Sequence, residues 1–314
     1  MADTSLPLAA APVRSRIRRP SGRRDARAHR LFVSPAVLAL LVLGLYPLLF
    51  ILAAALSESS LGKPFQEWVG TANLEAALLD ADIVASLVRG TAYAVGVSVV
   101  SLVLGVVVAL ALRHSVASGS IVRTVLLLPL IMPPVIVGTL WKLIYNPGGG
   151  LLATLTGFAG GDPASVSPLS SSAWSLPAIA VADVWEWTPL VALLVFTALL
   201  AQDEEPIEAA RLDGAHGFGL FRHITLPAIA GVVAAAFFIR LVLAFKVFDL
   251  IFMMTSGGPG QSTTTASYIV YQLALREFDV GMAAAVTLLL AVVVTVVTLP
   301  VAFLTRRLQA NHES

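Results

Sequence analysis

Six long apolar runs dominate this 314-residue chain and limit what it can fold into. The runs cover residues 31–56, 86–112, 122–145, 174–200, 226–255 and 282–304. Each is close to the ~20 residues that an α-helix needs to cross the hydrocarbon core of a membrane. Backbone polar groups in lipid must be satisfied within a helix or a closed barrel, and these runs are too long for barrel strands. We therefore predict an all-α integral membrane protein with six transmembrane helices.

The composition agrees with this fold class and excludes several kinds of site. The chain is 57% hydrophobic and 12% charged, its mean hydropathy is +0.87, and it contains no cysteine. A disulfide framework, an iron–sulfur cluster and a thiolate metal site are therefore excluded. The histidines lie at scattered polar positions without metal-ligand spacing: His29, His114, His216, His223 and His312. We expect no catalytic and no metal-ligating residues in this chain.

The first 30 residues differ from the rest because they carry eight arginines and show no apolar periodicity. Such a segment could also bind nucleic acid or target the protein, but the apolar run that follows is too long for a signal-peptide core. We expect residues 1–30 to be a disordered cytoplasmic tail and residues 31–305 to be the transmembrane domain. Residues 306–314 would form a short C-terminal tail in the cytoplasm.

The distribution of basic residues predicts the orientation in the membrane. One set of connections holds most of them, namely the N-terminal tail, Arg113 and Arg123, Arg211 and Arg222, and Arg306 and Arg307. The opposite connections hold at most Lys63, Arg89 and Arg276. Because cytoplasmic loops are enriched in lysine and arginine, both termini and the 202–226 loop are predicted to be cytoplasmic.

Three stretches are expected on the outer side. Residues 63–82 read as a loop with a short amphipathic helix at 73–79, and residues 146–173, rich in Gly, Ser and Pro, as a surface loop. Residues 255–260 read as a turn that closes the fifth span, and the hydroxyl-rich run 262–265 follows it. In the third span, the prolines are expected to produce a kink, because proline removes a backbone donor.

The polar stretch 205–229 lies between two apolar runs and reads as a short helix, a turn and a second short helix. Pro206 suits the first turn of a helix, which the acidic residues around it also favour. The helix should end near Leu212, because Gly214 and Gly217 follow and Gly217 or Gly219 can adopt positive φ. A second helix is expected from Phe218.

Several motifs in this chain resemble those of one family. Glu208-Ala209-Ala210, Asp213-Gly214-Ala215, Ile224 and Leu226-Pro227 together resemble the "EAA" loop of permease subunits in binding-protein-dependent ABC importers. Other stretches are similar to sugar-type permeases of this class: Trp68-Val69-Gly70, Phe248-Asp249-Leu250-Ile251, Gly257-Gly258-Pro259 and Phe278-Asp279-Val280-Gly281. The resemblance extends over about residues 31–305.

The resemblance implies a type I importer permease of the cytoplasmic (inner) membrane. Its partners would be a second, homologous permease subunit, a dimer of ATPase subunits and an extracytoplasmic solute-binding protein. The loop would be a coupling helix that docks into the ATPase through Glu208, Ala209, Ala210, Leu212, Asp213 and Gly214. Glu208 would pair with a basic residue of the ATPase, and Leu212 would fill an apolar pocket.

The chain itself lacks a nucleotide-binding loop. The phosphate-cradling motif needs G-x-x-x-x-G-K-[ST], and Gly62-Lys63-Pro64 lacks both the hydroxyl residue and the first glycine. ATP and Mg²⁺ would therefore be bound by the partner ATPase, and we expect no cofactor on this chain.

Charged residues within the predicted spans form a second candidate site. An ionised side chain inside the membrane costs about 2.5–3.5 kcal/mol on insertion scales, so such residues rarely face lipid. Counting ~1.5 Å per residue along each helix pairs Asp183 with Lys246 and Glu186 with Arg240. These charges could form ion pairs that hold the fourth helix against the fifth, or they could line a polar cavity for a hydroxyl-rich solute.

The candidate solute pathway combines these charges with aromatic rings, which suit a sugar. Its residues are Asp183, Trp185, Glu186, Trp187, Phe245, Lys246, Phe248 and Asp249. In the resembling maltose-type permeases, the solute pocket includes the fifth-span stretch before the G-G-P turn, but amide side chains stand there where this chain has Lys246.

The predicted function is therefore ATP-driven import of a di- or oligosaccharide or related polyol, with glycerol phosphate esters left open. A secondary transporter that uses an ion gradient is the alternative, although the chain shows no convincing internal repeat. A membrane-embedded transferase would need a paired catalytic acid and base or a metal site. The acids here lie opposite bases instead.

Overall fold

The computed structural model describes residues 24–114 and 119–310, and the chain divides into two units, one ending at Phe50 and one beginning at Ile51. Helix α1 (Arg24–Ala55) contributes the described part of the first unit and contains the first candidate span, Phe32–Ala55. Helix α1 therefore includes residues 24–30 of the expected tail, a segment rich in Arg and Ala, which are good helix formers. Residues 1–23 of the predicted tail lie outside the described residues.

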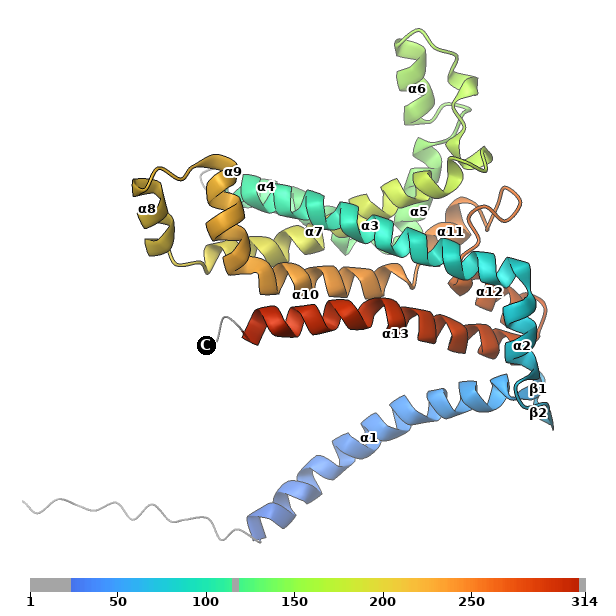
Figure 1. The fold of residues 1–314 in the computed structure, drawn as a ribbon. Coiled ribbons are helices and arrows are strands. Elements are labelled where there is room, and N and C mark those ends of the chain that lie inside the picture. Colours follow the sequence, from blue (N-terminus) through green and yellow to red (C-terminus); the bar gives the residue numbers. More distant parts are fainter. Residues whose placement is uncertain (1–23, 115–118, 311–314) are drawn as a thin grey trace, which may run out of the picture. The chain divides into compact units, whose positions relative to one another are not determined.

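The second unit consists of helices with one small β-hairpin (Figure 1). Its elements are β1 (Ser57–Ser60), β2 (Lys63–Trp68), α2 (Ala72–Leu79), α3 (Ala81–His114), α4 (Gly119–Ile131), α5 (Pro134–Ile144), α6 (Leu151–Phe158), α7 (Ser175–Leu200), α8 (Glu205–Leu212), α9 (Gly217–Leu220), α10 (Leu226–Ala244), α11 (Asp249–Met254), α12 (Ala266–Tyr271) and α13 (Val280–Ala310). Short 3₁₀ turns, η2 (Pro163–Ser165) and η3 (Pro168–Ser170), precede α7. There are also two π-helical turns in the described chain. The turn η4 (Phe221–Thr225) joins α9 to α10, and η5 (Gln272–Arg276) follows α12.

Five helices in the described part of the chain are long and apolar enough to cross a membrane, and the bent pair α4–α5 brings the number to six. The prediction of six spans is confirmed with this pair taken as one broken span. The bend between α4 and α5 is 104° and lies at Pro133 and Pro134, so the expected kink in the third span is present. Pro133 is extended (φ −60°, ψ 137°), and Pro134 begins the next helix.

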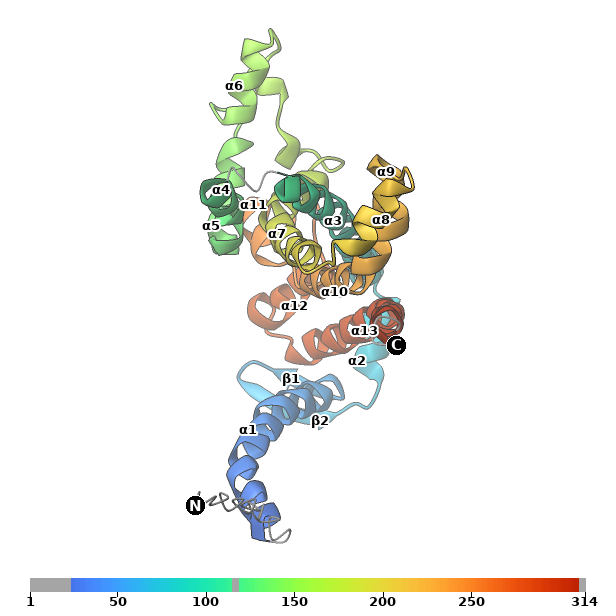
Figure 2. The same cartoon turned by 90° about the vertical axis from the view of Figure 1, so that its left-hand side faces the viewer.

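The core of the second unit lies where α3 and α7 pack together, with α10 against both and α13 against α10. Gly105 of α3 permits the close approach, because a Cβ at this position would lie 2.6 Å from Val191 Cγ1 of α7. Figure 2 looks onto the end that carries α8 and α9 and shows α7 among α3, α4 and α10. Buried aliphatic side chains of α3, α7 and α10 fill this end of the core.

The fifth span ends earlier in the chain than expected. The sequence predicted one helix over 226–255, but α10 ends at Ala244 and the separate helix α11 begins at Asp249. The apolar character of the sequence continues through this break, so hydropathy alone does not reveal it. The turn after α11 is present as expected, with Ser256 and Gly257 both at positive φ.

The end of the bundle near α2 contains structure that the sequence indicated only in part. The expected helix at 73–79 is confirmed as α2. The hairpin β1–β2 was not predicted; its register pairs Ser57 with Trp68, and Ser60 also bridges to Asp279 beside α13. Residues 146–173 were predicted to be only a loop, but they contain helix α6.

The two ends of the second unit differ in what they carry (Figure 1). The α8–α9 segment and the C-terminal end of α13 lie at one end. The hairpin, α2, α11 and α12 lie at the other end. The long helices α3, α7, α10 and α13 connect the two ends.

Candidate functional site

The loop between α7 and α10 has the predicted helix–turn–helix form. Pro206 lies in the first turn of α8 with Glu205 and Glu208, and Arg211 lies in the last turn. This arrangement places acids at the positive end of the helix dipole and a base at the negative end. Gly214 (φ +88°) and Gly217 (φ +56°) then take left-handed conformations that glycine adopts without steric penalty.

Helix α8 buries one residue and exposes others. Ile207 is 5% exposed, whereas Leu212 is 90% exposed and Phe218 of α9 is 72% exposed. Ile207 therefore anchors α8, while Leu212 and Phe218 leave a large apolar surface uncovered by the described chain. Exposed apolar patches with polar surroundings are typical of protein–protein contact sites.

The face of α8 toward the bundle forms a small polar hollow of about 230 Å³. Arg113 from the end of α3 lines this hollow together with Glu204, Glu208 and Arg211. Arg113 Nη1 also donates a hydrogen bond to Gln202 Oε1 at 3.3 Å. Glu208, expected to face an ATPase, thus lies near two arginines of its own chain.

The buried charges pair differently from the prediction. Arg240 Nη2 donates to Asp183 Oδ2, and Arg240 Nε donates to Ser101 Oγ at 3.2 Å. Arg240 and Asp183 are 0% and 3% exposed, respectively. This polar group joins α3, α7 and α10 in the core. The predicted pairs Asp183–Lys246 and Glu186–Arg240 are wrong, because the helix break after Ala244 invalidates depths counted along a single helix.

The remaining charged residues of the candidate pathway are separated. Glu186 is buried, and its Oε2 has no hydrogen-bond partner in the described part of the chain. Lys246 is exposed and Asp249 is half-buried, and both lie at the junction between α10 and α11. The candidate pathway therefore consists of a buried group in the core and a more accessible group at the helix break.

The helix break at residues 245–248 is supported by the hydroxyl-rich stretch that follows α11. Ser267 Oγ donates to Phe245 O at 3.0 Å, and Thr265 Oγ1 donates to Val247 O at 3.4 Å. A broken helix in a membrane is tolerated only where its freed backbone groups find partners. These two hydroxyl groups supply them, which is a role that the sequence reasoning did not assign to this stretch.

An aromatic cluster lies next to the break. The ring centroid of Phe248 is 5.5 Å from that of Phe252 and 5.1 Å from that of Tyr271, and Tyr268 also stacks against Phe248. Tyr268 Oη donates to Ser256 O at 2.9 Å, which fixes its ring. Of the predicted aromatic residues, Phe248 belongs to this cluster, whereas Phe245 is 5% exposed and part of the core.

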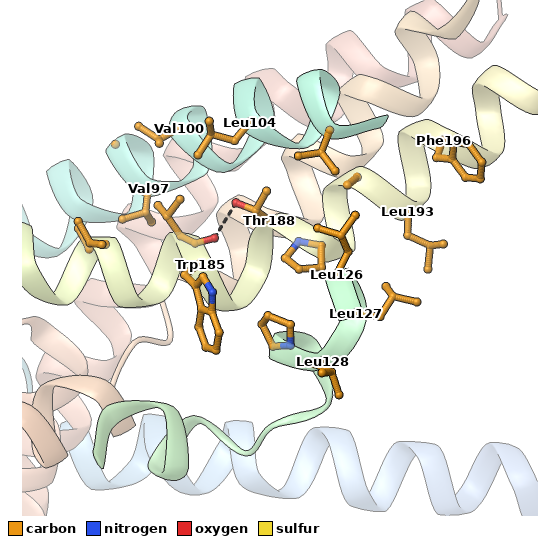
Figure 3. A pocket seen from close by; sticks show the side chains of 18 of the residues that line it. Val97, Val100, Leu104, Leu126, Leu127, Leu128, Trp185, Thr188, Leu193 and Phe196 are labelled. Carbon is orange, nitrogen blue, oxygen red and sulfur yellow. Dashed lines mark hydrogen bonds between the residues drawn. The ribbon is translucent and has the colours of Figure 1, made fainter. Parts of the chain in front are cut away.

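A large cavity runs between α3, α4 and α7 and has a volume of about 1380 Å³ (Figure 3). Its lining is mostly aliphatic, with aromatic rings from Tyr93, Trp141, Trp185 and Phe196. Trp185 packs edge-on to Trp141 with centroids 5.9 Å apart. Thr188 also lines the cavity, but its Oγ1 donates to Val184 O of its own helix at 2.6 Å.

Trp185 and the acids of α7 lie on different faces of that helix. Asp183 and Glu186 are buried toward α10, whereas Trp185 lines the cavity and is 37% exposed. Trp187 is half-buried and does not line the cavity. The sequence placed Trp185 and Trp187 beside Glu186, but successive helical residues point in directions about 100° apart.

Sequence reasoning missed several residues of these groups. Ser101, Tyr93 and Tyr271 were not singled out because a serine or tyrosine in an apolar helix gives no signal of its partner. Arg113 served only as an indicator of orientation. Periodicity could have pointed to Ser101, since Ser98 and Ser101 lie one turn apart on a buried face of α3. No group of three His, Asp or Glu side chains in the described ranges could hold a metal ion.

The fold and the loop together define the class of protein. A six-helix membrane bundle of the type I importer fold with a helical loop at one end is a transport permease and not an enzyme. Residues 101–310 match the family described as "Binding-protein-dependent transport system inner membrane component", and the chain belongs to this family.

Similar proteins cover most of the chain. It is 31% identical over 272 residues to the probable ABC transporter permease protein y4oQ of Sinorhizobium fredii, covering 86% of this chain and 87% of that one. It is 30% identical over 280 residues to the trehalose/maltose transport system permease protein MalF of Thermococcus litoralis, covering 88% and 94%. The alpha-glucoside transport system permease protein AglF of Rhizobium meliloti is 29% identical over 277 residues, covering 86% and 79%.

A solved structure has the same fold. A chain of a bacterial alginate ABC transporter, in complex with a periplasmic protein that holds an alginate pentasaccharide, superposes with a TM-score of 0.78. The superposition covers 91% of this chain and 96% of that chain at 21% sequence identity. The expectation of a type I importer permease is thereby confirmed for the fold.

Proposed function

We propose that this permease imports a di- or oligosaccharide or a related polyol, delivered by an extracytoplasmic binding protein and driven by a separate ATPase. The observation that carries the proposal is the exposed surface of the α8–α9 loop, where Leu212 is 90% exposed at the end of a helix that carries the Glu208-Ala209-Ala210 motif. An exposed leucine at the end of a short rigid helix suits insertion into an apolar pocket of another subunit.

The coupling surface would consist of Glu208, Ala209, Ala210, Leu212, Asp213 and Gly214. The alanines allow close approach of a partner, and Gly214 permits the turn. The loop connects directly to α7 and, through η4, to α10. These two helices are joined in the core by Asp183 and Arg240, so a displacement of α8 would move them together.

The orientation and the partners follow from the same proposal. The α8–α9 end carries Arg113, Arg211 and Arg222, and it would face the cytoplasm by the positive-inside rule. Because α13 ends at the same end, the C-terminus would be cytoplasmic as well. A second, homologous permease and two ATPase subunits holding ATP and Mg²⁺ would complete the transporter in the cytoplasmic membrane.

The cargo is proposed from the names of the relatives and from the aromatic groups. Trehalose, maltose and alpha-glucosides appear in the names of relatives that are 27–30% identical. The rings of Phe248, Trp141 and Trp185 offer apolar faces for the C–H surface of a sugar. The cavity between α3, α4 and α7 offers few hydrogen-bonding groups, so the second permease would supply partners for the sugar hydroxyl groups.

Lys246 and Asp249 are proposed to be the polar contacts of this chain with the cargo. They lie at a break between two helices, and discontinuous helices of this kind form solute sites in many transporters. Asp183, Glu186 and Trp187 are instead assigned to the helix core, with Asp183 and Glu186 less than 4% exposed.

Uptake of a panel of radiolabelled solutes by proteoliposomes that contain the assembled transporter tests this proposal. We expect uptake of trehalose or maltose, and a several-fold increase in KM for Lys246→Gln because a hydrogen-bonding charge is lost. Lys142→Gln is the matched control, since Lys142 is exposed and its Nζ donates to a backbone oxygen, Met253 O, at 3.1 Å. Transport of amino acids or peptides but no saccharide would contradict the cargo assignment, and an unchanged KM for Lys246→Gln would remove Lys246 from the pathway.

A further inference from the structure

Helix α6 presents an uncharged face that no described residue covers. Leu151, Leu155 and Phe158 are 56%, 55% and 86% exposed, and their spacing of four and three residues places them on one face of the helix. Thr154 lies on the same face, but its Oγ1 donates to Gly150 O at 3.0 Å, so its hydroxyl group is already satisfied. Residues 143–161 contain no charged side chain.

The level of α6 along the bundle is fixed by a hydrogen bond. Tyr145 Oη, just after α5, donates to Ala178 O in the first turn of α7 at 3.2 Å. A candidate membrane span begins at Ser175, the first residue of α7. The chain then reaches α6 through a tight turn in which Gly150 N donates to Asn146 O at 2.8 Å. Helix α6 therefore starts near the level of the first residues of α7, where the membrane span of that helix begins.

The surroundings of this level resemble a membrane–water interface. Trp174 immediately precedes α7 and is 66% exposed, and tryptophan is enriched where the hydrocarbon core meets water. The polar residues Asp162 and Ser165 follow α6 in the chain. The apolar face of α6 and a polar connection thus lie side by side at the end of a span.

The direction of α6 fits a helix that lies along the membrane surface. The bend of 104° between α4 and α5 turns the chain away from the direction of the spans. In both views α6 runs across the direction of α3 and α13 and projects sideways from their bundle (Figures 1 and 2). A helix in this position can place one face in lipid and the opposite side toward water.

We propose that α6 is an interfacial helix, with Leu151, Leu155 and Phe158 inserted in the lipid leaflet at the end of the bundle opposite the α8–α9 loop. Interfacial helices bind in proportion to the apolar area that they bury. A docking surface for a soluble binding protein would carry a polar rim with hydrogen-bonding groups. The exposed face of α6 lacks charged groups and free hydroxyl groups, which favours lipid over a protein partner.

Site-directed spin labelling tests this proposal, and the chain is suited to it because it has no native cysteine. The label is placed at Leu155→Cys and Phe158→Cys, with Ser165→Cys as the matched control in the same connection. The full-length chain is reconstituted in lipid nanodiscs alone, then with its permease and ATPase partners, and then with the binding protein. Collision of the label with oxygen, which partitions into lipid, is compared with collision with a water-soluble nickel complex.

We expect oxygen collisions to exceed nickel collisions for Leu155→Cys and Phe158→Cys in all three preparations, and the reverse for Ser165→Cys. Nickel collisions that dominate at both α6 positions would overturn the proposal. The labels could instead become shielded from both oxygen and nickel only when the second permease or the binding protein is added. That result would also overturn the proposal and would assign the face of α6 to contact with the added protein. If one labelled variant does not fold, the other still decides. The result does not depend on the cargo, because it requires only insertion of the chain in a membrane.

Discussion

At the scale of single residues, the ion pair of Asp183 with Arg240 is the most consequential feature. Both side chains are almost fully buried, and Ser101 Oγ accepts a further hydrogen bond from the guanidinium group. Transferring charges out of water is unfavourable, so a buried pair is stable only when its geometry and hydrogen bonds are good. Removing one partner leaves the other charge buried without compensation, which is much worse than removing both.

This reasoning gives a double-mutant prediction. Asp183→Leu and Arg240→Met should each lower the free energy of unfolding by about 3–5 kcal/mol, whereas the double variant should lie close to the wild type. Thermal unfolding in one detergent measures the three variants and the wild type. Two single variants as stable as the wild type would show that the pair does not join α7 to α10.

The identity of the buried charges could be predicted from the sequence, but their pairing could not. Asp183, Glu186 and Arg240 were recognised because charged residues in apolar helices are rare. The depths of Asp183 and Glu186 were counted from the outer start of the fourth span, and those of Lys246 and Arg240 from Thr255 along one uninterrupted fifth helix. The chain leaves the helix between Ala244 and Asp249, where no proline or glycine signals the break, and hydroxyl groups from a later segment stabilise it.

At the scale of elements, the packing of α3 on α7 depends on one glycine. A Cβ at Gly105 would lie 2.6 Å from Val191 Cγ1 and 3.1 Å from Ala192 N, so Gly105→Ala forces the two helices apart. We expect a loss of about 1–3 kcal/mol in stability. Gly96→Ala on the same helix is the matched control, because no atom lies within 4 Å of the added Cβ.

The control should be neutral or stabilise the protein by up to about 1 kcal/mol, since alanine is a better helix former than glycine. Thermal unfolding of both variants checks the comparison. Val191→Ala combined with Gly105→Ala should recover part of the loss. Equal stability of Gly105→Ala and Gly96→Ala would contradict the close contact between α3 and α7.

A second prediction at this scale concerns the exposed end of α8. Leu212→Asp should abolish ATP-driven uptake, because a charge cannot enter an apolar pocket of a partner without a large desolvation penalty. The stability of the isolated chain should change by less than about 0.5 kcal/mol, because Leu212 is 90% exposed. Uptake and thermal unfolding are measured on the same preparation. Full uptake by this variant would exclude Leu212 from the coupling surface.

The sequence was most informative for long apolar elements and for the α8–α9 loop. Five of the span positions follow from hydropathy, and Pro206, Gly214 and Gly217 mark the loop because proline and glycine have specific backbone preferences. The hairpin β1–β2 was missed because its strands are short and largely polar, with Pro64 in β2, and so lack the alternating apolar pattern of a strand. Helix α6 was missed because it lies among glycines and prolines that favour turns.

At the scale of the whole second unit, two ends are joined by long helices that share a buried polar group. The α8–α9 loop connects to α7 and α10 at one end, and the break with its aromatic cluster follows α10 at the other. Because α7 and α10 are joined through Asp183 and Arg240, they are suited to move as one body. Under the proposed function, such an arrangement would convert a displacement of the α8–α9 loop into a change at the proposed solute site.

The central claim is that import requires ATP hydrolysis by a separate subunit acting on the α8–α9 loop. It is tested most directly by uptake of radiolabelled trehalose or maltose into proteoliposomes that contain the assembled transporter, with ATP inside and the binding protein outside. We predict uptake only when the ATPase, ATP and the binding protein are all present, and no uptake by this chain alone with any ion gradient. Uptake by this chain alone, driven by a proton or sodium gradient, would contradict the account.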